Sequence, residues 1–384
     1  MLAALVFLVP VLVLFLQVVL AFFATRAAAA VTQASGRAAV LIPAHNESAV
    51  IAETLATLKP QLRAGDRIVV VADNCSDDTA ELVRNAGVEV LERQNLEQRG
   101  KGFALDFGVR HLEKNPPDVL VIVDADCQVL DGALVTLIAK AQAAQRPVQA
   151  LYLMKAPAGS GLKLRLAEFA WAVRNFVRPQ GWHNVGLPCQ LMGTGMAFPW
   201  PMAARMSLAN ANIVEDMKLG IDLALEGTPP LFCPEAVVTS EFPTVDTAVQ
   251  SQRTRWEHGH MGMILQEVPR LLGRAVLDGN VRLLGLALDL LVPPLALLVT
   301  MLCAVLLVTG VWAFVAGGSV AFALALLACS LMFTAVLLAW LKWGRQMVSG
   351  VELLSVPFYV LAKIPLYLRF LTRRQKEWVR TDRK

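Results

Sequence analysis

The chain has 384 residues, of which 56% are hydrophobic and only 17% are charged, with a formal net charge of +4. A typical soluble domain has about 25% charged residues, so this composition excludes an ordinary soluble protein and also a disordered chain. The small net charge gives no reason to expect a nucleic-acid partner. The six cysteines contain no C-x-x-C pair, which argues against a zinc site and a disulfide framework.

The first apolar segment, residues 1–25, is predicted to be a transmembrane helix. Gln17 is the one polar residue between Leu2 and Phe23, and a helix of this length measures about 33 Å, enough to cross a membrane. A cleaved signal peptide is the alternative, but the apolar run is too long and no positive charge precedes it. Because Arg26 and Arg37 follow the run and no Lys or Arg precedes it, the next segment is expected in the cytoplasm.

Apolar sequence returns near the C-terminus and predicts a transmembrane helical hairpin over residues 291–341. Lys342 closes the second apolar run on the expected cytoplasmic side. Residues 347–371 are apolar but contain Pro, Glu and Lys, so both a re-entrant and a transmembrane helix are open there. A basic cytoplasmic tail follows at residues 372–384.

Residues 36–264 have the composition of a globular domain. Short β-rich runs alternate with helical stretches, which predicts an α/β fold with a mainly parallel sheet. Strands are expected at 38–42, 67–72, 88–92 and 119–123, and helices at 48–62, 77–86 and 102–112. Residues 265–290 are expected to form an interfacial amphipathic helix, with an ordinary helix of the domain as the alternative.

Polar residues follow three of the predicted strands, at the sheet edge where such folds bind ligands. They are Pro43-Ala44-His45-Asn46-Glu47, Asp73, and Asp124-Ala125-Asp126. Asp124 and Asp126 are expected to face the same side, because alternate residues of an extended chain point the same way. Two such carboxylates suit Mg²⁺ or Mn²⁺ on a diphosphate, although a D-x-D sequence alone is often only a turn.

Further motifs add cations and small residues. Lys101 begins a predicted helix between two glycines and can approach a phosphate there, with a solvated turn as the alternative. Gly193-Thr194-Gly195 lies in an apolar run, where small residues permit close approach of a ligand or of another chain segment.

Two motifs near the end of the domain add acids and a cation beside an aromatic ring. Glu215-Asp216 precedes an amphipathic stretch. On a helix Gln252, Arg255 and Trp256 share one face, so they can converge on one ligand. An interfacial Trp-Arg anchor is the alternative for this group.

The order of these motifs resembles membrane-embedded family 2 glycosyltransferases, such as cellulose, chitin and hyaluronan synthases and ceramide glucosyltransferase. The likeness spans roughly residues 38–260. It implies a GT-A nucleotide-sugar-binding domain that transfers a hexosyl or N-acetylhexosaminyl group, with inversion, from a nucleoside-diphosphate donor that is expected to be UDP-linked. It also implies Mg²⁺ or Mn²⁺ as the cofactor.

The resemblance implies a role for each motif. Asp73 and Asp124 would hold the nucleoside, Asp126 with Asp124 the metal, and Asp216 would be the general base. Arg255 would neutralise the leaving diphosphate. The implied donor-binding residues are Pro43, His45, Glu47, Asp73, Lys101, Asp124, Asp126, Gln252, Arg255 and Trp256, and the acceptor-binding residues are Gly193, Thr194, Gly195 and Trp256.

Three or four membrane helices are fewer than the resemblance implies for a synthase that threads a polymer outward. We therefore expect one or a few transfers to a lipid-borne or saccharide acceptor at the cytoplasmic face of the cell (inner) membrane. The alternatives are a processive exopolysaccharide synthase acting as a homo-oligomer or with export partners, and a non-catalytic partner in polysaccharide export.

Overall fold

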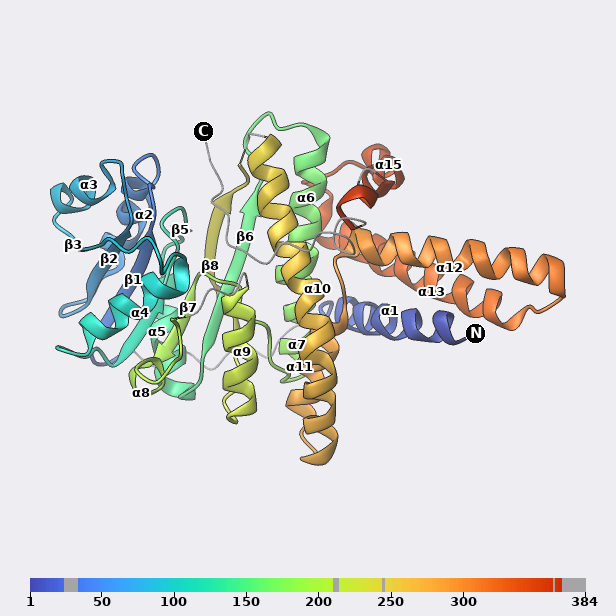
Figure 1. Cartoon of the computed structure of the whole chain (residues 1–384), viewed down its shortest axis with the longest axis horizontal. Helices are drawn as coiled ribbons and strands as arrows, with labels where there is room; N and C mark the ends of the chain where they lie inside the picture. The colour runs from blue at the N-terminus through green and yellow to red at the C-terminus, as the bar shows by residue number, and fades with distance from the viewer. Residues whose placement is uncertain (24–33, 210–213, 244–245, 362, 368–384) are drawn as a thin grey trace.

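An eight-stranded sheet is the centre of the structure, a computed structural model that describes all residues except 24–33, 210–213, 244–245, 362 and 368–384 (Figure 1). The side chains of residues 246–253 also lie outside the described part. The strands are β1 (Ala38–Ala44), β2 (Arg67–Asp73), β3 (Glu89–Arg93), β4 (Val119–Ile122), β5 (Gln128–Val129), β6 (Val148–Lys155), β7 (Met196–Pro199) and β8 (Leu231–Glu241). Their order across the sheet is β3-β2-β1-β4-β7-β6-β8-β5.

Strands β1 to β4 form the parallel half of the sheet, as the sequence predicts. Strand β7 departs from that prediction, because it runs antiparallel to both β4 and β6. The sheet is therefore mixed. Since Met196 at the start of β7 lies opposite Ile122 at the end of β4, the segment before β7 comes back to the carboxyl end of β4, where ligands bind in such sheets.

Helices cover both faces of the sheet. They include α2 (Ile51–Leu58), α3 (Thr79–Asn85), α4 (Lys101–Leu112), α5 (Ala133–Ala144), α8 (Trp200–Ala203) and α9 (Glu215–Leu225). Val40 and Ile42 of β1 pack in the core formed with α2 and α5, whereas Ala39 and Leu41 pack with α4. A strand that is buried on both faces must be apolar throughout, which explains the continuous apolar run of β1.

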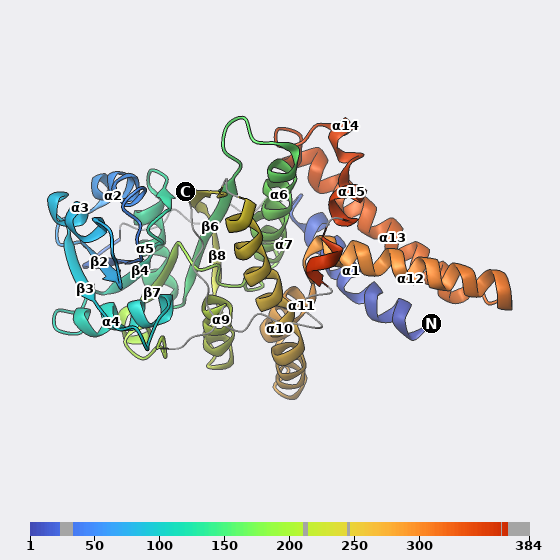
Figure 2. The same cartoon turned by 45° about the horizontal axis from the view of Figure 1, so that its top comes forward.

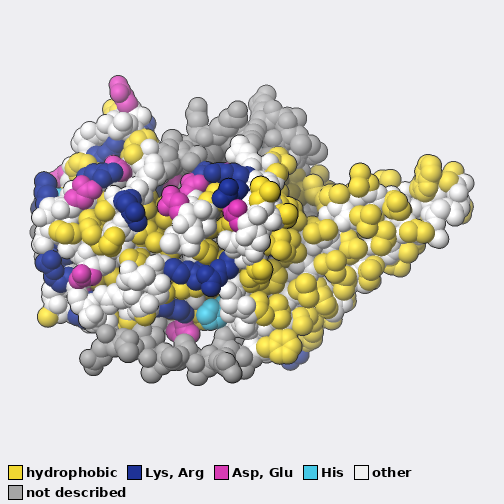
Figure 3. Space-filling model, turned by 90° about the horizontal axis from the view of Figure 1, so that it is seen from below, with side chains coloured by type: hydrophobic (Ala, Val, Ile, Leu, Met, Phe, Trp, Pro, Cys, Tyr) yellow, Lys and Arg dark blue, Asp and Glu magenta, His cyan; other side chains and the backbone are white. Residues whose placement is uncertain are grey.

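Three apolar helices extend away from the sheet as an arm (Figures 1 and 2). They are α1 (Leu2–Leu20), α12 (Leu295–Ala316) and α13 (Val320–Ala339). In the described part of the chain these are the helices long and apolar enough to cross a membrane. The surface of the arm is hydrophobic in Figure 3, whereas Lys, Arg, Asp and Glu lie over the sheet domain. The chain thus has the composition and shape of a membrane protein, with apolar helices at one end and a polar α/β domain at the other.

Lys342 marks the base of the arm, just after α13. Its Nζ lies 4.5 Å from the centre of the Phe22 ring and 4.6 Å from that of the Trp343 ring. The C-terminal ends of α1 and α13 therefore lie together beside the sheet domain. Lys342, which the sequence analysis expects on the cytoplasmic side, lies at this point. Such cation–π contacts suit an ammonium group at a membrane boundary.

The polar residue within α1, Gln17, is bound to the sheet domain through two partners. Helix α6 (Leu162–Ala172) continues through a π-helical segment (Val173–Val177) into α7 (Arg178–Asn184). Arg178 donates through Nε to Gln17 Oε1 at 2.9 Å and through Nη2 to Asp289 Oδ1 at 2.9 Å, and Gln17 Nε2 donates to Asp289 Oδ1 at 2.7 Å. All three side chains are buried. Each satisfies the others, so the membrane helix is fixed to the domain.

Residues 265–290 do not form the single amphipathic helix that was predicted. They are divided between α10 (Asp246–Leu277) and α11 (Val281–Leu291). The break has a local cause, since the Asn280 side chain accepts from the backbone N–H groups of Arg282 and Leu283 and so caps a new helix.

Within residues 347–371, the described part forms the short helices α14 (Gly350–Leu353) and α15 (Val356–Leu361). Each is far shorter than the roughly 20 residues that a crossing needs. The predicted basic tail, 372–384, lies outside the described residues.

Candidate active site

The carboxyl end of β4 presents two carboxylates to a cavity. Asp124 and Asp126 are partly exposed, whereas Ala125 and Cys127 between and after them are buried in the core. This alternation is the one that the sequence predicts for the D-x-D motif. Both carboxylates line a cavity of about 180 Å³. The same cavity is lined by Lys101, Gly193, Glu215, Asp216, Arg255 and Trp256.

Lys101 joins three of the predicted motifs. Its Nζ lies 2.5 Å from Asp124 Oδ1 and donates to the carbonyl oxygen of Gly193 at 2.7 Å. Burial lowers the pKa of Lys101, but Asp124, Glu215 and Asp216 together raise the pKa above its ordinary value, so the side chain stays charged. Lys101 therefore connects the carboxyl end of β4 to the loop before β7.

The loop 193–195 divides into one residue that faces the cavity and two that do not. Gly193 lines the cavity and has φ +88°. Thr194 is fully buried, where its Oγ1 accepts from the Asp124 backbone N–H at 3.0 Å. A Cβ at Gly195 would lie 2.7 Å from Ala150 Cβ. The expectation that Thr194 and Gly195 contact an acceptor is thus corrected, because both are enclosed by protein and position the loop instead.

Glu215 and Asp216 begin α9 at the edge of the cavity. Burial, and then the adjacent charge of Asp216, raises the pKa of Glu215 to about 7. Burial also raises the pKa of Asp216, against the lowering effect of the Lys101 ammonium. Two neighbouring carboxylates with raised pKa values titrate as a pair and can bind or release a proton near neutral pH.

Arg255 and Trp256 lie on helix α10 and also line the cavity. The Trp256 ring lies 4.9 Å from the ring of Trp171, measured between centres. The Arg174 guanidinium lies 5.7 Å from the Trp171 ring centre. The side chain of Gln252, the third residue of this predicted group, lies outside the described part. The structure therefore places a cation and two aromatic rings, tilted by 44° to each other, in the lining of the same cavity as the acidic residues.

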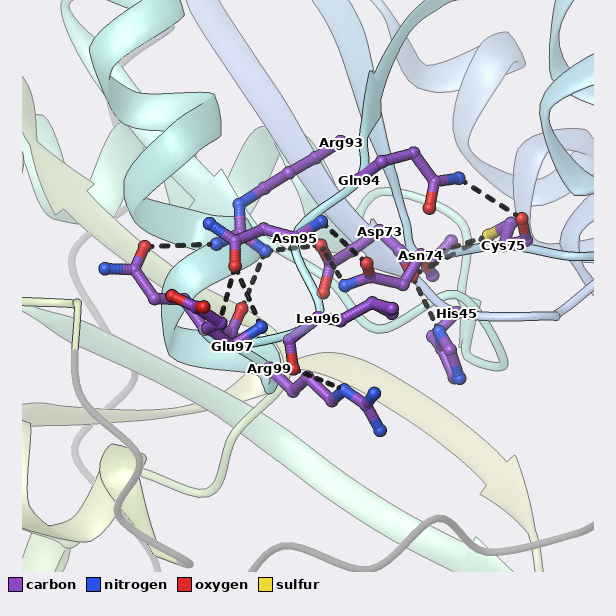
Figure 4. Close-up of polar contacts among 12 residues, drawn as sticks. His45, Asp73, Asn74, Cys75, Arg93, Gln94, Asn95, Leu96, Glu97 and Arg99 are labelled. Atoms are coloured by element: carbon purple, nitrogen blue, oxygen red, sulfur yellow. Dashed lines mark hydrogen bonds and ion pairs between the residues drawn. The ribbon is translucent and has the colours of Figure 1, made fainter.

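A second polar group lies at the carboxyl ends of β1 and β2 (Figure 4). The Asp73 carboxylate is buried and accepts from Arg93 Nη1 at 2.6 Å and from Asn74 Nδ2 at 3.0 Å. His45 Nδ1 lies 2.6 Å from the carbonyl oxygen of Asp73. The ion pair with Arg93 fixes Asp73 at the end of β2.

The loops after β1 and β2 hold each other by hydrogen bonds. Asn46 Oδ1 accepts from the Ser76 backbone N–H at 2.7 Å, and the Glu47 backbone N–H donates to Thr79 Oγ1 at 2.9 Å. Asn46 has φ +55°, a conformation that Asn tolerates better than most residues. Pro43, in β1, pairs with Val71 of β2. Pro43, His45, Glu47 and Asp73 thus lie at or just after the carboxyl ends of β1 and β2, outside the lining of the cavity.

Three residues of the site region were missed by the sequence analysis. Arg93 is a cation at the end of β3, next to the end of β2 in the sheet. Arg174 and His260 line the cavity from the π-helical segment and from α10. These residues depend on pairings between distant segments, and no pattern in the sequence singled them out.

Comparison with known proteins agrees with this geometry. The profile of the family described as "Glycosyltransferase like family 2" matches residues 36–259, more than half of the chain. The chain belongs to glycosyltransferase-like family 2. This membership confirms the family resemblance and, with the mixed sheet, the predicted GT-A fold carrying apolar helices at both ends.

Two curated relatives of this family 2 protein cover it in part. The probable glycosyltransferase YdaM of Bacillus subtilis is 25% identical over 245 residues, 60% of this chain and 56% of YdaM. The uncharacterized protein MJ1222 of Methanocaldococcus jannaschii is 37% identical over 89 residues, 23% of this chain and 35% of that protein. The chain thus spans about a third and about half of the lengths of these two relatives.

A solved structure shares the fold over nearly the whole length. The mannosyltransferase PcManGT from Pyrobaculum calidifontis, in complex with GDP-Man and Mn²⁺, has a TM-score of 0.56, with 97% of each chain covered. The sequence identity is 19%, so the likeness is one of fold.

The geometry of Gly193 gives a first testable prediction. A Cβ there would lie 3.2 Å from Asp216 Oδ2 and 3.5 Å from Lys101 Nζ. The distance to Lys101 Nζ is an ordinary contact, but Gly193→Ala should strain the backbone at φ +88° and push the Asp216 carboxylate aside. We expect the rate of sugar transfer to fall about tenfold, since a misplacement of about 1 Å can cost about 100-fold. The rate is measured with thermal unfolding recorded on the same preparation.

The matched control is Gly87→Ala, because Gly87 has φ +68° and open space around its Cβ position. It should lose about 1 kcal/mol of stability from the strained backbone while its transfer rate stays at the wild-type value. Equal rates in the two variants would contradict the prediction that a Cβ at Gly193 disturbs the Asp216 carboxylate.

Proposed function

We propose that this protein transfers a sugar, with inversion, from a nucleoside-diphosphate donor to a lipid-borne or saccharide acceptor. The donor is expected to be UDP-linked and the sugar a hexose or an N-acetylhexosamine. The observation that supports this is one cavity in which the paired carboxylates of the D-x-D motif, an acid with a raised pKa and the Arg255 cation lie together. In a direct displacement these groups could hold a metal on the diphosphate, remove the acceptor proton and stabilise the charge of the leaving group.

Mg²⁺ or Mn²⁺ is the cofactor that this donor set suits. Asp126 with Asp124 supplies hard oxygen ligands, and the described residues contain no group of three or more His, Cys, Asp or Glu that could hold a metal by themselves. Such a site fits an ion that takes its remaining ligands from a diphosphate. When bound, the ion would stabilise negative charge on the diphosphate oxygens.

The remaining steps are assigned to side chains of the protein. Asp216 removes the proton of the acceptor hydroxyl as its oxygen attacks the anomeric carbon from the face opposite the diphosphate. The bond from that carbon to the diphosphate breaks, and the nucleoside diphosphate leaves beside Arg255. Lys101 holds Asp124 and the loop at Gly193 in place. The buried, raised pKa of Asp216 makes it a stronger base than an exposed carboxylate.

The pH dependence tests the acidic pair. The base Asp216 titrates together with Glu215, and the pKa of Glu215 is raised to about 7, so the acidic pair gains a proton and kcat/KM should fall as the pH drops through about 7. Glu215 and Asp216 titrate as a pair, so Glu215→Gln removes the member whose pKa is about 7 and should move the acid limb of the profile to lower pH. Glu226→Gln, at the exposed end of α9, is the matched control and should leave the limb in place. A limb that does not move in Glu215→Gln contradicts the coupling.

We further propose that transfer takes place at the cytoplasmic face of the cell (inner) membrane. The Lys342 ammonium lies where α1 and α13 meet the domain, and cationic residues favour the cytoplasmic side. The domain beside Lys342 would then reach a nucleotide sugar in the cytoplasm and an acceptor in the membrane.

The proposed function is tested with membranes that contain the full chain and Mn²⁺. Radiolabelled UDP-hexoses, UDP-N-acetylhexosamines and GDP-mannose are supplied singly, and the product is partitioned between organic solvent and water. A discrete organic-soluble product supports the proposal. A high-mass aqueous product favours a processive synthase acting with partners or as an oligomer. No incorporation from any donor contradicts sugar transfer and favours a non-catalytic export partner.

A further inference from the structure

A second cavity, of about 170 Å³, lies between the catalytic cavity and the membrane arm. Its outer wall is apolar and comes from the arm and α15, with Ala296, Val299, Met332, Val336 and Val360 among the lining residues. A hydrocarbon chain suits such a wall, whereas a saccharide would find few hydroxyl partners there.

The two cavities meet at a shared wall. Trp171, Arg174, Arg178, Trp256 and His260 line both of them. A molecule that enters from the membrane side would therefore reach Asp216 by passing these residues.

Arg174 makes this junction suitable for an anion. It lies in the π-helical segment Val173–Val177, a kind of distortion that is frequent at functional sites. Its neighbour Arg178 is paired with Asp289 at 2.9 Å. Among the described residues Arg174 contacts the Trp171 ring and has no carboxylate at ion-pair distance, although Asp216, Glu257 and Asp289 are close enough to act on its charge. Burial and the Arg178 charge lower the pKa of Arg174 in spite of the opposing carboxylates, so a bound anion would stabilise its guanidinium.

His260 provides a hydrogen-bond acceptor at the same wall. Its Nε2 lies 3.1 Å from the carbonyl oxygen of Leu290, which can only accept, so Nε2 must be the donor. Nδ1 then has a free lone pair, and it is buried without a partner among the described residues. Burial lowers the pKa of His260 to about 3, so the ring is neutral at physiological pH. A ligand hydroxyl would satisfy this atom.

We propose that this second cavity binds the hydrocarbon chain of an anionic lipid acceptor, whose phosphate contacts Arg174 and whose head-group hydroxyl lies between His260 and Asp216. The assignment rests on the proposed function and narrows its acceptor to a lipid with a hydroxyl-bearing phosphate ester head. The acceptor loses its hydroxyl proton to Asp216, its oxygen bonds to the anomeric carbon, and the nucleoside diphosphate leaves. Diacyl phosphoinositol and isoprenyl phosphosugar both have this chemistry.

The test uses the full chain in phosphatidylcholine nanodiscs with a photoreactive phosphatidylinositol that carries its diazirine at the end of one acyl chain. Labelled peptides are mapped by mass spectrometry, and the labelling is competed with unlabelled phosphatidylinositol, an isoprenyl phosphosugar or diacylglycerol. We expect labels on the parts of α12, α13 and α15 that line the cavity. One or both of the phosphate lipids should compete, and the lipid that competes shows which class of acceptor the cavity binds. Competition by diacylglycerol as strong as by both of them would overturn the role of the phosphate.

Two variants separate the cavity from the general lipid surface. Ala296→Trp fills the cavity and should abolish the labelling, whereas Val308→Trp, on the exposed side of the same helix α12, should leave it unchanged. Arg174→Gln should weaken competition by the phosphate lipid about tenfold and leave competition by diacylglycerol unchanged. Arg174→Lys should restore part of the competition by the phosphate lipid. Labelling that persists in Ala296→Trp would overturn the proposal.

Binding of the nucleotide-sugar donor is measured on the same nanodiscs by titration. Donor binding without cavity labelling would contradict the proposed lipid site only, because the donor part of the proposed function would still hold. Cavity labelling without donor binding would contradict the proposed function and would still support a lipid site.

Discussion

Asp216→Asn should lower kcat by about 100- to 10,000-fold, the range that general-base catalysis contributes. Asn has nearly the same shape as Asp, but it cannot take a proton from an acceptor hydroxyl. Donor binding should change little, because the D-x-D carboxylates are intact. Single-turnover transfer and donor titration on one preparation measure the two effects separately.

Asp222→Asn is the matched control for this variant, since Asp222 lies on the same helix and forms an ion pair with Lys218. It should retain turnover near the wild-type value. If Asp216→Asn also retained turnover, Asp216 would not be the base, and Glu215, its neighbour with a pKa of about 7, would be the next residue to examine.

Asp126→Asn should remove most of the metal-dependent part of donor binding. In the wild-type protein, Mn²⁺ is expected to tighten binding of the nucleoside diphosphate at least about tenfold, which corresponds to about 1.4 kcal/mol. Replacing one of two carboxylates by an amide weakens the ion's hold, so the variant should show little difference with and without Mn²⁺. Calorimetric titration of the diphosphate in both conditions measures this difference.

The control for the metal prediction is Asp131→Asn, a change of the same type at an exposed position after β5. It should keep the full effect of Mn²⁺. An undiminished metal effect in Asp126→Asn would contradict the assignment of the D-x-D motif as the metal site.

The parallel half of the sheet and its polar edge could be predicted from the sequence because they depend on local pattern. Apolar runs of strand length, each followed by polar residues, located β1, β2 and β4. The alternation along the chain at Asp124 and Asp126 then determined which side chains would face the ligand and which the core.

Other parts of the site depend on contacts between distant segments and could not be read in this way. The antiparallel entry of β7 brings Gly193 to Lys101, across 92 positions of sequence. The ion pair of Asp73 with Arg93 requires β3 to lie next to β2. Similarly, the polar Gln17 in an apolar helix is explained only by Arg178 and Asp289, which come from α7 and α11.

The most direct test of the account is the anomeric configuration of the first product. The full chain is incubated with an α-linked nucleotide sugar that it accepts and with Mn²⁺, and the new linkage is determined by proton NMR before any second transfer. A one-step displacement with Asp216 as the base predicts a β-linked product. An α-linked product would contradict it, since retention requires a route other than direct attack from the face opposite the diphosphate.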